Sequence, residues 1–182
     1  MEPSLPVSFY AREAEVVARD LLGKVLVREL DGRPLHVRIV ETEAYLGPHD
    51  LACHASKGRT ARTEVMFGPP GHAYVYLIYG MYDMLNVVTG RNGSAQAVLI
   101  RAAEPLATLD AGTNGPGRLT RALEVDRSLN GHLLVDRPLY LTAGRPPAQV
   151  VATSRVGIEY SGPWRDARLR FFDGASRFVS KR

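Results

Sequence analysis

Residues 41 to 54 read Glu-Thr-Glu-Ala-Tyr-Leu-Gly-Pro-His-Asp-Leu-Ala-Cys-His and hold two glutamates, a tyrosine and two histidines. Apolar residues precede this cluster at Val37, Ile39 and Val40. Because alternating apolar residues are typical of a β-strand, we expect a buried strand to carry the cluster to one end of a sheet. Charged residues are rare in a plain core strand. The cluster is therefore the first candidate for a functional site.

Length and composition favour one ordinary domain over residues 1–182. Of the 182 residues, 45% are hydrophobic and 23% are charged, which is usual for a globular protein. The longest apolar stretches, near residues 21–30 and 98–103, fall short of the roughly 20 residues of a membrane span. The first residues lack a basic region followed by an apolar one, which argues against a secretory signal. We expect a cytoplasmic or nucleoid-associated protein with no membrane partner.

Cysteine and histidine usage limits the metal chemistry. Cys53 is the one cysteine in the sequence, so an intrachain disulfide and the usual cysteine-based zinc site are excluded. His49, Asp50 and His54 could be metal ligands, but no second cluster of ligands follows them. We expect no metal and no other cofactor.

The basic residues are mostly arginine. The net charge is +4, and three of the 23 basic residues are lysine. Arginine binds phosphate bidentately, which suits a nucleic-acid surface. A GC-rich genome that replaces lysine by arginine throughout would give the same count. The charge therefore permits a nucleic-acid partner without requiring one.

Hydrophobic spacing predicts a helix followed by a β-hairpin. Apolar residues recur at helical spacing over 14–22, and Gly23 is a suitable C-terminal stop. Residues 24–30 and 35–40 alternate on either side of an Asp-Gly turn, which predicts two antiparallel strands. Residues 46–71 are rich in Gly, Pro, His, Arg and Thr. A loop of that length is usually functional or disordered.

Aromatic and β-branched residues dominate 72–89, which predicts one long strand or a bent pair with Gly80 at the bend. An Asn-Gly turn then leads to a strand over 97–103 that pairs with this run. The remaining segments are a loop over 104–117, a helix over 118–125 and short strands over 139–141, 150–156 and 169–172. Without regular crossover helices, antiparallel pairing is favoured. The expected fold is α+β: a single mixed domain with a curved, mainly antiparallel sheet, a protruding β-hairpin and flanking helices.

Two features are each open to a structural or a functional interpretation. Four of the eight tyrosines lie within residues 74–82, where they could simply pack. A large side chain beside Met81 at an exposed bend would instead suit a wedge pushed into a base stack. Glu41 and Glu43 are two apart and face the same side of a strand. A carboxylate among aromatic residues is a candidate general base, and a solvated strand end is the alternative.

Short blocks distributed along the chain carry a family resemblance. In order, they are Val40-Glu-Thr-Glu-Ala-Tyr-Leu-Gly-Pro48, Ala52-Cys-His54, Arg59-Thr-Ala-Arg62, Met66-Phe67, Tyr74-Val-Tyr-Leu-Ile-Tyr-Gly-Met-Tyr82, Asn86, Val98-Leu-Ile-Arg-Ala-Ala-Glu-Pro105, Asn114-Gly-Pro-Gly-Arg-Leu119 and Arg155-Val-Gly157. With these blocks the chain resembles the alkyladenine (3-methyladenine) DNA glycosylase family over nearly its whole length. The Glu-Ala-Tyr and Tyr-x-x-Tyr-Gly-Met blocks together are highly specific.

The resemblance implies a base-excision-repair enzyme that flips an alkylated or deaminated purine out of duplex DNA and hydrolyses its N-glycosidic bond. Glu43 would activate the water that attacks the anomeric carbon. Arg101 and the carbonyl of Val156 would help to hold that water. No lysine falls within the matched catalytic positions, so we expect a monofunctional enzyme without a lyase step.

The resemblance also implies how the base and the duplex are held. Tyr45, His54 and Tyr76 would form the walls around the extruded base, and Asn86 would clash with groups to be rejected. The partner would be double-stranded DNA containing damaged purines, approached by a monomer from the minor-groove side. The side chains at the predicted bend, Tyr79 and Met81, would fill the gap that the flipped base leaves in the duplex.

General chemistry is consistent with these roles. Flipping a base costs a few kcal/mol, and damage lowers that cost. An alkylated purine is cationic, so an aromatic cage attracts it by about 0.5–2 kcal/mol per contact. It also leaves easily, so one carboxylate and a water can suffice. A neutral lesion such as hypoxanthine would need an acid that the sequence does not identify. A non-catalytic binder of damaged DNA and a nucleosidase of free nucleosides remain alternatives.

Overall fold

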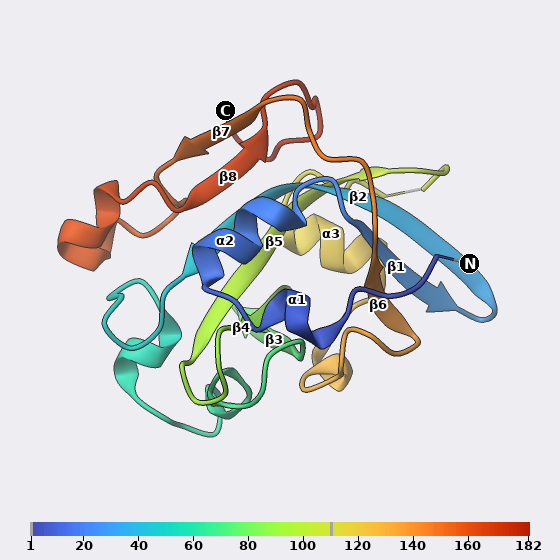
Figure 1. The fold of residues 1–182 in the computed structure, drawn as a ribbon. Coiled ribbons are helices and arrows are strands. Elements are labelled where there is room, and N and C mark those ends of the chain that lie inside the picture. The colour runs from blue at the N-terminus through green and yellow to red at the C-terminus, as the bar shows by residue number, and fades with distance from the viewer. Residues whose placement is uncertain (1, 110) are drawn as a thin grey trace.

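The computed structural model describes residues 2–109 and 111–182. Met1 and Asp110, the latter within the loop expected over 104–117, lie outside the described residues. The strands form an eight-stranded sheet in the order β3-β4-β5-β2-β1-β6, with β8 paired to β2 and β7 paired to β8. Every pair is antiparallel. The sheet curls, and helices flank it (Figure 1). The predicted α+β fold is therefore confirmed.

The strands are β1 (Val25–Leu30), β2 (Arg33–Tyr45), β3 (Ala73–Ile78), β4 (Tyr82–Thr89), β5 (Gln96–Pro105), β6 (Leu139–Thr142), β7 (Val150–Thr153) and β8 (Arg170–Asp173). The α-helices are α1 (Val7–Tyr10), α2 (Ala14–Leu21) and α3 (Pro116–Ala122). Short 3-10 helices are η1 (His54–Lys57), η2 (Glu64–Phe67), η3 (Arg127–Leu129) and η4 (Glu159–Asp166). None of the helices among the described residues is long and apolar enough to cross a membrane.

Strand β2 is the centre of the sheet. Its apolar residues Val37 and Ile39 are fully buried, as the alternation predicted. One edge of β2 pairs with β5, and the other pairs first with β1 and then with β8. The register between β2 and β5 shifts around Glu41, where a β-bulge or irregularity interrupts the ladder. Bulges redirect side chains and often lie beside functional sites. The polar end of β2 is thus enclosed by β5 on one edge and by β8 on the other.

Helix α2 packs one face on the sheet. Ala14, Val17, Ala18 and Leu21 are fully buried, and their spacing of three and four residues places them on one side of the helix. Gly23 follows with a φ of +84°, the left-handed conformation with which helices commonly end. The helix therefore begins and ends close to where the pattern predicted, and it covers the inner part of β2.

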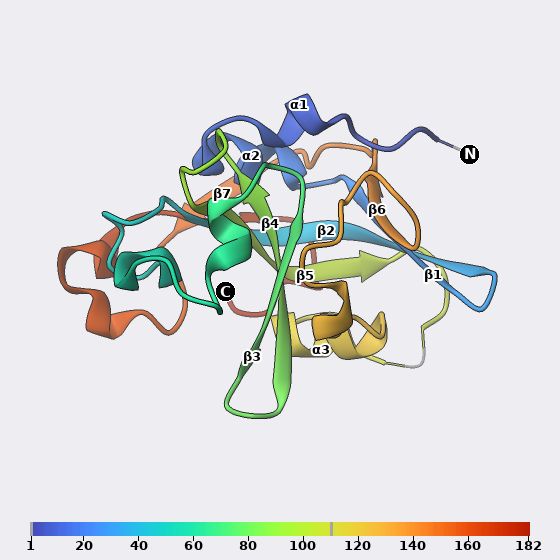
Figure 2. The same ribbon diagram turned by 90° about the horizontal axis from the view of Figure 1, so that it is seen from below.

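The aromatic run is a reversing hairpin and not one long strand. Strands β3 and β4 pair from Ala73↔Val87 to Ile78↔Tyr82, and the hairpin projects away from the sheet (Figure 2). Tyr79 and Gly80 have φ values of 54° and 66°. Paired positive φ values are typical of tight hairpin turns. Of the two predicted alternatives, one long strand or a bent pair with Gly80 at the bend, the structure has the pair, and the chain reverses at Tyr79 and Gly80.

The long segment after β2, for which a functional or a disordered loop was expected, has a defined structure. It contains η1 and η2, and it buries Cys53, Ala55 and Met66 against Tyr74 of β3. This small second core supports the back of the hairpin. Composition could not predict it, because the apolar residues of the segment fall mainly in two short runs, 51–53 and 65–67, which show no helical or strand period. Several other bounds differ by one to three residues from those predicted: for example, α3 begins at Pro116 and β7 ends at Thr153.

Candidate active site

A pocket of about 260 Å³ opens between the β3–β4 hairpin, strand β5 and the segment after β7. Of the nine residues predicted for the site, seven line it: Tyr45, His54, Tyr76, Tyr79, Asn86, Arg101 and Val156. The other lining residues are mostly apolar or small and include Ala52, Cys53, Met66, Ala97 and Leu99. Side chains from distant parts of the sequence are thus brought around one cavity. Glu43 and Met81 do not line it.

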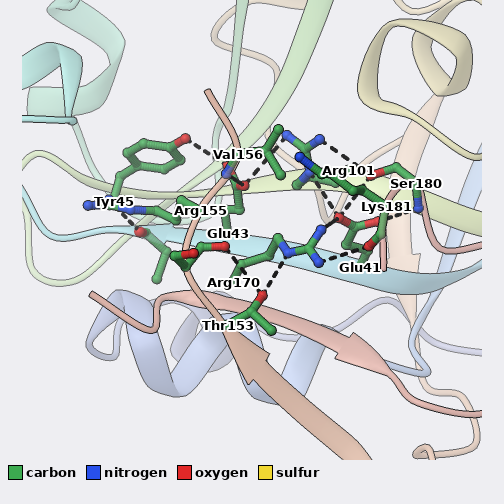
Figure 3. Close-up of polar contacts among 12 residues, drawn as sticks. Glu41, Glu43, Tyr45, Arg101, Thr153, Arg155, Val156, Arg170, Ser180 and Lys181 are labelled. Carbon is green, nitrogen blue, oxygen red and sulfur yellow. Dashed lines mark hydrogen bonds and ion pairs between the residues drawn. The ribbon is translucent and has the colours of Figure 1, made fainter. Parts of the chain in front are cut away.

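Glu43 lies behind the pocket wall, and its side chain is fully buried. Its Oε2 accepts a hydrogen bond from the Tyr45 hydroxyl at 2.8 Å, and its Oε1 accepts one from the Val156 backbone N–H at 2.7 Å. The guanidinium of Arg101 lies 3.6 Å from the same Oε1. All three partners line the pocket. The carboxylate is therefore held in one orientation directly beside the cavity (Figure 3).

Val156 makes a contact that was not predicted, because its backbone N–H donates to Glu43 Oε1. The role that the resemblance implied for its carbonyl, holding the water, stays a prediction. Strand β7 ends at Thr153, so Val156 lies in an irregular segment whose N–H is free to reach a side chain. Irregular backbone of this kind has no pattern in the sequence.

Aromatic rings form one wall of the pocket. The rings of His54 and Tyr76 lie 4.5 Å apart between centroids at 68°, and those of Tyr74 and Tyr76 lie 5.3 Å apart. His54 Nδ1 is 3.0 Å from the Tyr74 hydroxyl. The Asn86 amide donates to the backbone carbonyl of Tyr74 at 3.1 Å. Each side chain of this wall is therefore held in place by contacts with its neighbours.

Burial sets the protonation of these rings. It lowers the pKa of His54 from 6.5 to about 4, with a further contribution from the Arg62 charge. It raises the pKa of Tyr74 to about 12 and raises that of Tyr45 well above its usual value, to which the Glu43 charge adds. At neutral pH the wall therefore consists of uncharged rings, to which a cationic base can be attracted.

Arg101 stays charged in spite of its burial. Burial alone would lower the pKa of its guanidinium, but the charges of Glu43 and Glu41 outweigh this and raise it. The pocket lining thus includes a fixed cation, and a fixed carboxylate lies directly behind it.

Acid is expected to destabilise the protein through His54. Its pKa in the folded protein, about 4, lies below the ordinary 6.5, so the unfolded chain binds more protons between these values. The stability that depends on neutral His54 is complete above about pH 6.5 and is lost as the pH falls towards 4. When the free energy of unfolding is measured with urea across this pH range, it should fall less for His54→Gln than for the wild type. If the free energy of unfolding changed equally with pH in both proteins, His54 would not be the group responsible.

The hairpin tip is exposed at the mouth of the pocket. Tyr79 is 84% exposed and Met81 is 63% exposed. A non-glycine residue with positive φ, such as Tyr79, is uncommon and costs free energy. A strained, exposed aromatic residue at a projecting tip contributes nothing to the core, which points to a role in binding.

The sequence did not identify a buried ion pair that holds this region together. Arg155 contacts Asp50 through two hydrogen bonds, of 2.6 and 2.9 Å, and neither side chain is exposed. Arg155 also donates to the Ala44 carbonyl at 2.9 Å and lies over the ring of Tyr45 at 4.8 Å. The partners are 105 residues apart. The Arg155-Val-Gly157 block was the one available signal.

Within the described residues, no group of three or more His, Cys, Asp or Glu side chains could hold a metal ion. In particular, His49 stacks edge-on with Trp164 and His54 contacts Tyr74. Asp50 is fully engaged by Arg155 and by two backbone N–H groups. These three candidate ligands therefore have separate structural partners.

A buried carboxylate thus lies beside an aromatic pocket, and an exposed aromatic residue stands at its mouth, an arrangement that suits an enzyme acting on a flat aromatic group. The family model described as Methylpurine-DNA glycosylase (MPG) matches residues 8–177, and the chain belongs to this family. The family expectation from the sequence is thereby confirmed, and with it the expectation of an enzyme.

Curated relatives agree with this membership over their whole length. A protein of Myxococcus xanthus (strain DK1622) is 54% identical over 181 residues, covering 97% of this chain and 93% of the relative. One of Legionella pneumophila (strain Lens) is 49% identical over 180 residues, covering 97% and 98%. One of Methanocella arvoryzae is 48% identical over 199 residues, covering 99% and 97%. All three bear the name "Putative 3-methyladenine DNA glycosylase".

Proposed function

We propose that this protein flips an alkylated or deaminated purine out of double-stranded DNA and hydrolyses its N-glycosidic bond, leaving an abasic site. The observation that carries the proposal is Glu43, a fully buried carboxylate oriented by three groups that line a preformed aromatic pocket. A purine is flat and aromatic and matches such walls. The names of the relatives support alkylated purines as the substrate class.

In this mechanism Glu43 accepts a proton from a water molecule as the oxygen attacks the anomeric carbon. The bond from that carbon to the purine nitrogen breaks, and its electron pair leaves with the base. A cationic alkylated purine departs as a neutral base, so no acid is required for it, whereas a deaminated purine such as hypoxanthine must also receive a proton as it leaves. Arg101 and the backbone of Val156, both beside Glu43, hold the carboxylate and water in place. One positioned carboxylate contributes about 10²–10⁴-fold to such a rate.

The walls select the base. Tyr45, His54 and Tyr76 line the pocket, and their neutral rings attract a cationic purine by about 0.5–2 kcal/mol for each good contact. Neutral His54 adds no charge that would repel this substrate. Asn86 is fixed by its hydrogen bond to the Tyr74 carbonyl. It excludes bases that carry a group which would clash with its side chain.

The hairpin tip fills the space that the flipped nucleotide leaves. Tyr79 lines the pocket mouth, and Met81 is exposed beside it. Apolar wedges that enter from the minor groove separate base steps in this way. The protein is proposed to act on the duplex as a monomer. No lysine lines this pocket within the described residues, which supports hydrolysis without a lyase step.

The test is single-turnover release of free base from duplexes that each carry one lesion: 3-methyladenine, 7-methylguanine, hypoxanthine or ethenoadenine. We expect release from at least the 3-methyladenine duplex, strand cleavage only after alkali, and duplex affinity that falls with salt. An undamaged duplex and free nucleosides are the controls. Tight binding without release would favour a damaged-DNA binder, and release from nucleosides alone would favour a nucleosidase.

A further inference from the structure

A second buried glutamate, Glu41, lies beside Glu43 and accepts hydrogen bonds from four groups. Its Oε1 accepts from Arg101 Nε at 3.0 Å, Arg170 Nη1 at 2.9 Å and the Ser180 hydroxyl at 2.9 Å. Its Oε2 accepts from the Ser180 backbone N–H at 2.6 Å. The Glu41 side chain is fully buried. A buried carboxylate is stable only when it is paired and bonded in this way.

Two of these donors come from the last residues of the chain. Ser180 contributes both its backbone N–H and its hydroxyl, and Val179 before it is buried. The carbonyl of Lys181 accepts from Arg170 Nη2 at 2.8 Å. The C-terminal segment 179–181 is therefore bonded into the interior of the sheet (Figure 3).

The same contacts determine the orientation of Arg101. Its Nε is held by Glu41 at 3.0 Å, and its Nη2 donates to the Ser180 hydroxyl at 3.3 Å. The third nitrogen, Nη1, lies 3.6 Å from Glu43 Oε1. A guanidinium is planar and rigid, so fixing two of its nitrogens fixes the direction of the third. Arg101 is directed at Glu43 by groups outside the pocket.

We propose that Glu41 and Ser180 are positioning residues for this reaction, through which the C-terminal segment holds Arg101 against the catalytic carboxylate. The inference rests on the proposed role of Glu43 and Arg101. Neither Glu41 nor Ser180 lines the pocket, so they act through Arg101 and not on the DNA. Without the Ser180 hydroxyl, Arg101 would keep one fixed nitrogen and could rotate away from Glu43.

The test compares Ser180→Ala with Ser180→Thr, which keeps the hydroxyl. We expect Ser180→Ala to lower the single-turnover rate of base release about tenfold, the effect of losing one hydrogen bond to a charged group. Dissociation constants for lesion duplex should match the wild type, and the thermal midpoint should fall by only a few degrees, because Glu41 keeps three of its four donors. Ser180→Thr should recover most of the rate and of the thermal midpoint. Ser176→Ala is the matched control, because its hydroxyl accepts from Phe178 N–H and does not contact Glu41.

A second measurement is independent of catalysis. In ¹⁵N NMR spectra the Arg101 Nε–H should exchange slowly with water in the wild type and at least tenfold faster in Ser180→Ala. Unchanged exchange, or a rate loss shared by Ser176→Ala, would overturn the proposal. If Arg101 behaves as expected while the wild type releases no base, the proposed function fails and the positioning contact stands.

Discussion

Replacing Glu43 by glutamine is expected to lower the single-turnover rate of base release by about 10³-fold, within the 10²–10⁴-fold range of positioned acid–base groups. An amide cannot accept the proton of the attacking water. The change should leave the fold intact, because the amide oxygen can still accept from the Val156 N–H and the amide nitrogen can donate to the Tyr45 hydroxyl. Base release should be measured with enzyme in excess over a duplex with one lesion.

The control for this change is Glu64→Gln. Glu64 lies in η2, is 59% exposed and pairs with Arg59 at 2.9 Å, so its loss of charge should leave the rate unaltered. Duplex affinity of Glu43→Gln should equal that of the wild type, since Glu43 does not line the pocket. A rate within fivefold of the wild type would exclude Glu43 as the residue that activates water.

Local patterns predicted the parts of the fold that depend on local physics. Alternation located β1 and β2, helical spacing and Gly23 located α2, and the Asp-Gly turn at residues 31 and 32, both with positive φ, joined the two strands. These features depend on neighbours within a few residues. The chain reversal within the aromatic run was harder to predict. A tight turn at Tyr79 and Gly80 can be recognised only when a non-glycine residue is allowed positive φ.

Contacts between distant residues could not be predicted in this way. Ser180 lies 139 residues from Glu41, and the partners of the Asp50–Arg155 pair are 105 residues apart. From the sequence alone, Arg170 cannot be distinguished from an ordinary polar residue of a short strand. Periodicity indicates which face of an element is apolar, but not which loop or terminus supplies the partner of a buried charge.

Asn in place of Asp50 is expected to lower the free energy of unfolding by about 3–5 kcal/mol, the usual cost of removing one partner of a buried ion pair. The substitution keeps the size of the side chain but leaves the Arg155 charge buried without a counter-charge. All four groups around Asp50 are donors: two nitrogens of Arg155 and the N–H groups of Leu46 and Ala52. An amide nitrogen would therefore face at least one of them, donor against donor.

Urea denaturation should show this loss, and the thermal midpoint should fall by roughly 10 °C for a domain of this size. The matched control is Asp20→Asn, in an exposed pair with Arg12 at 2.7 Å whose side chains are 38% and 49% exposed. Exposed pairs contribute at most about 1 kcal/mol. A loss from Asp50→Asn no larger than that from Asp20→Asn would show that burial does not set the strength of the Asp50–Arg155 pair. A large loss would mean that the segment whose Val156 N–H orients Glu43 is held in place by a charge pair on the far side of Tyr45.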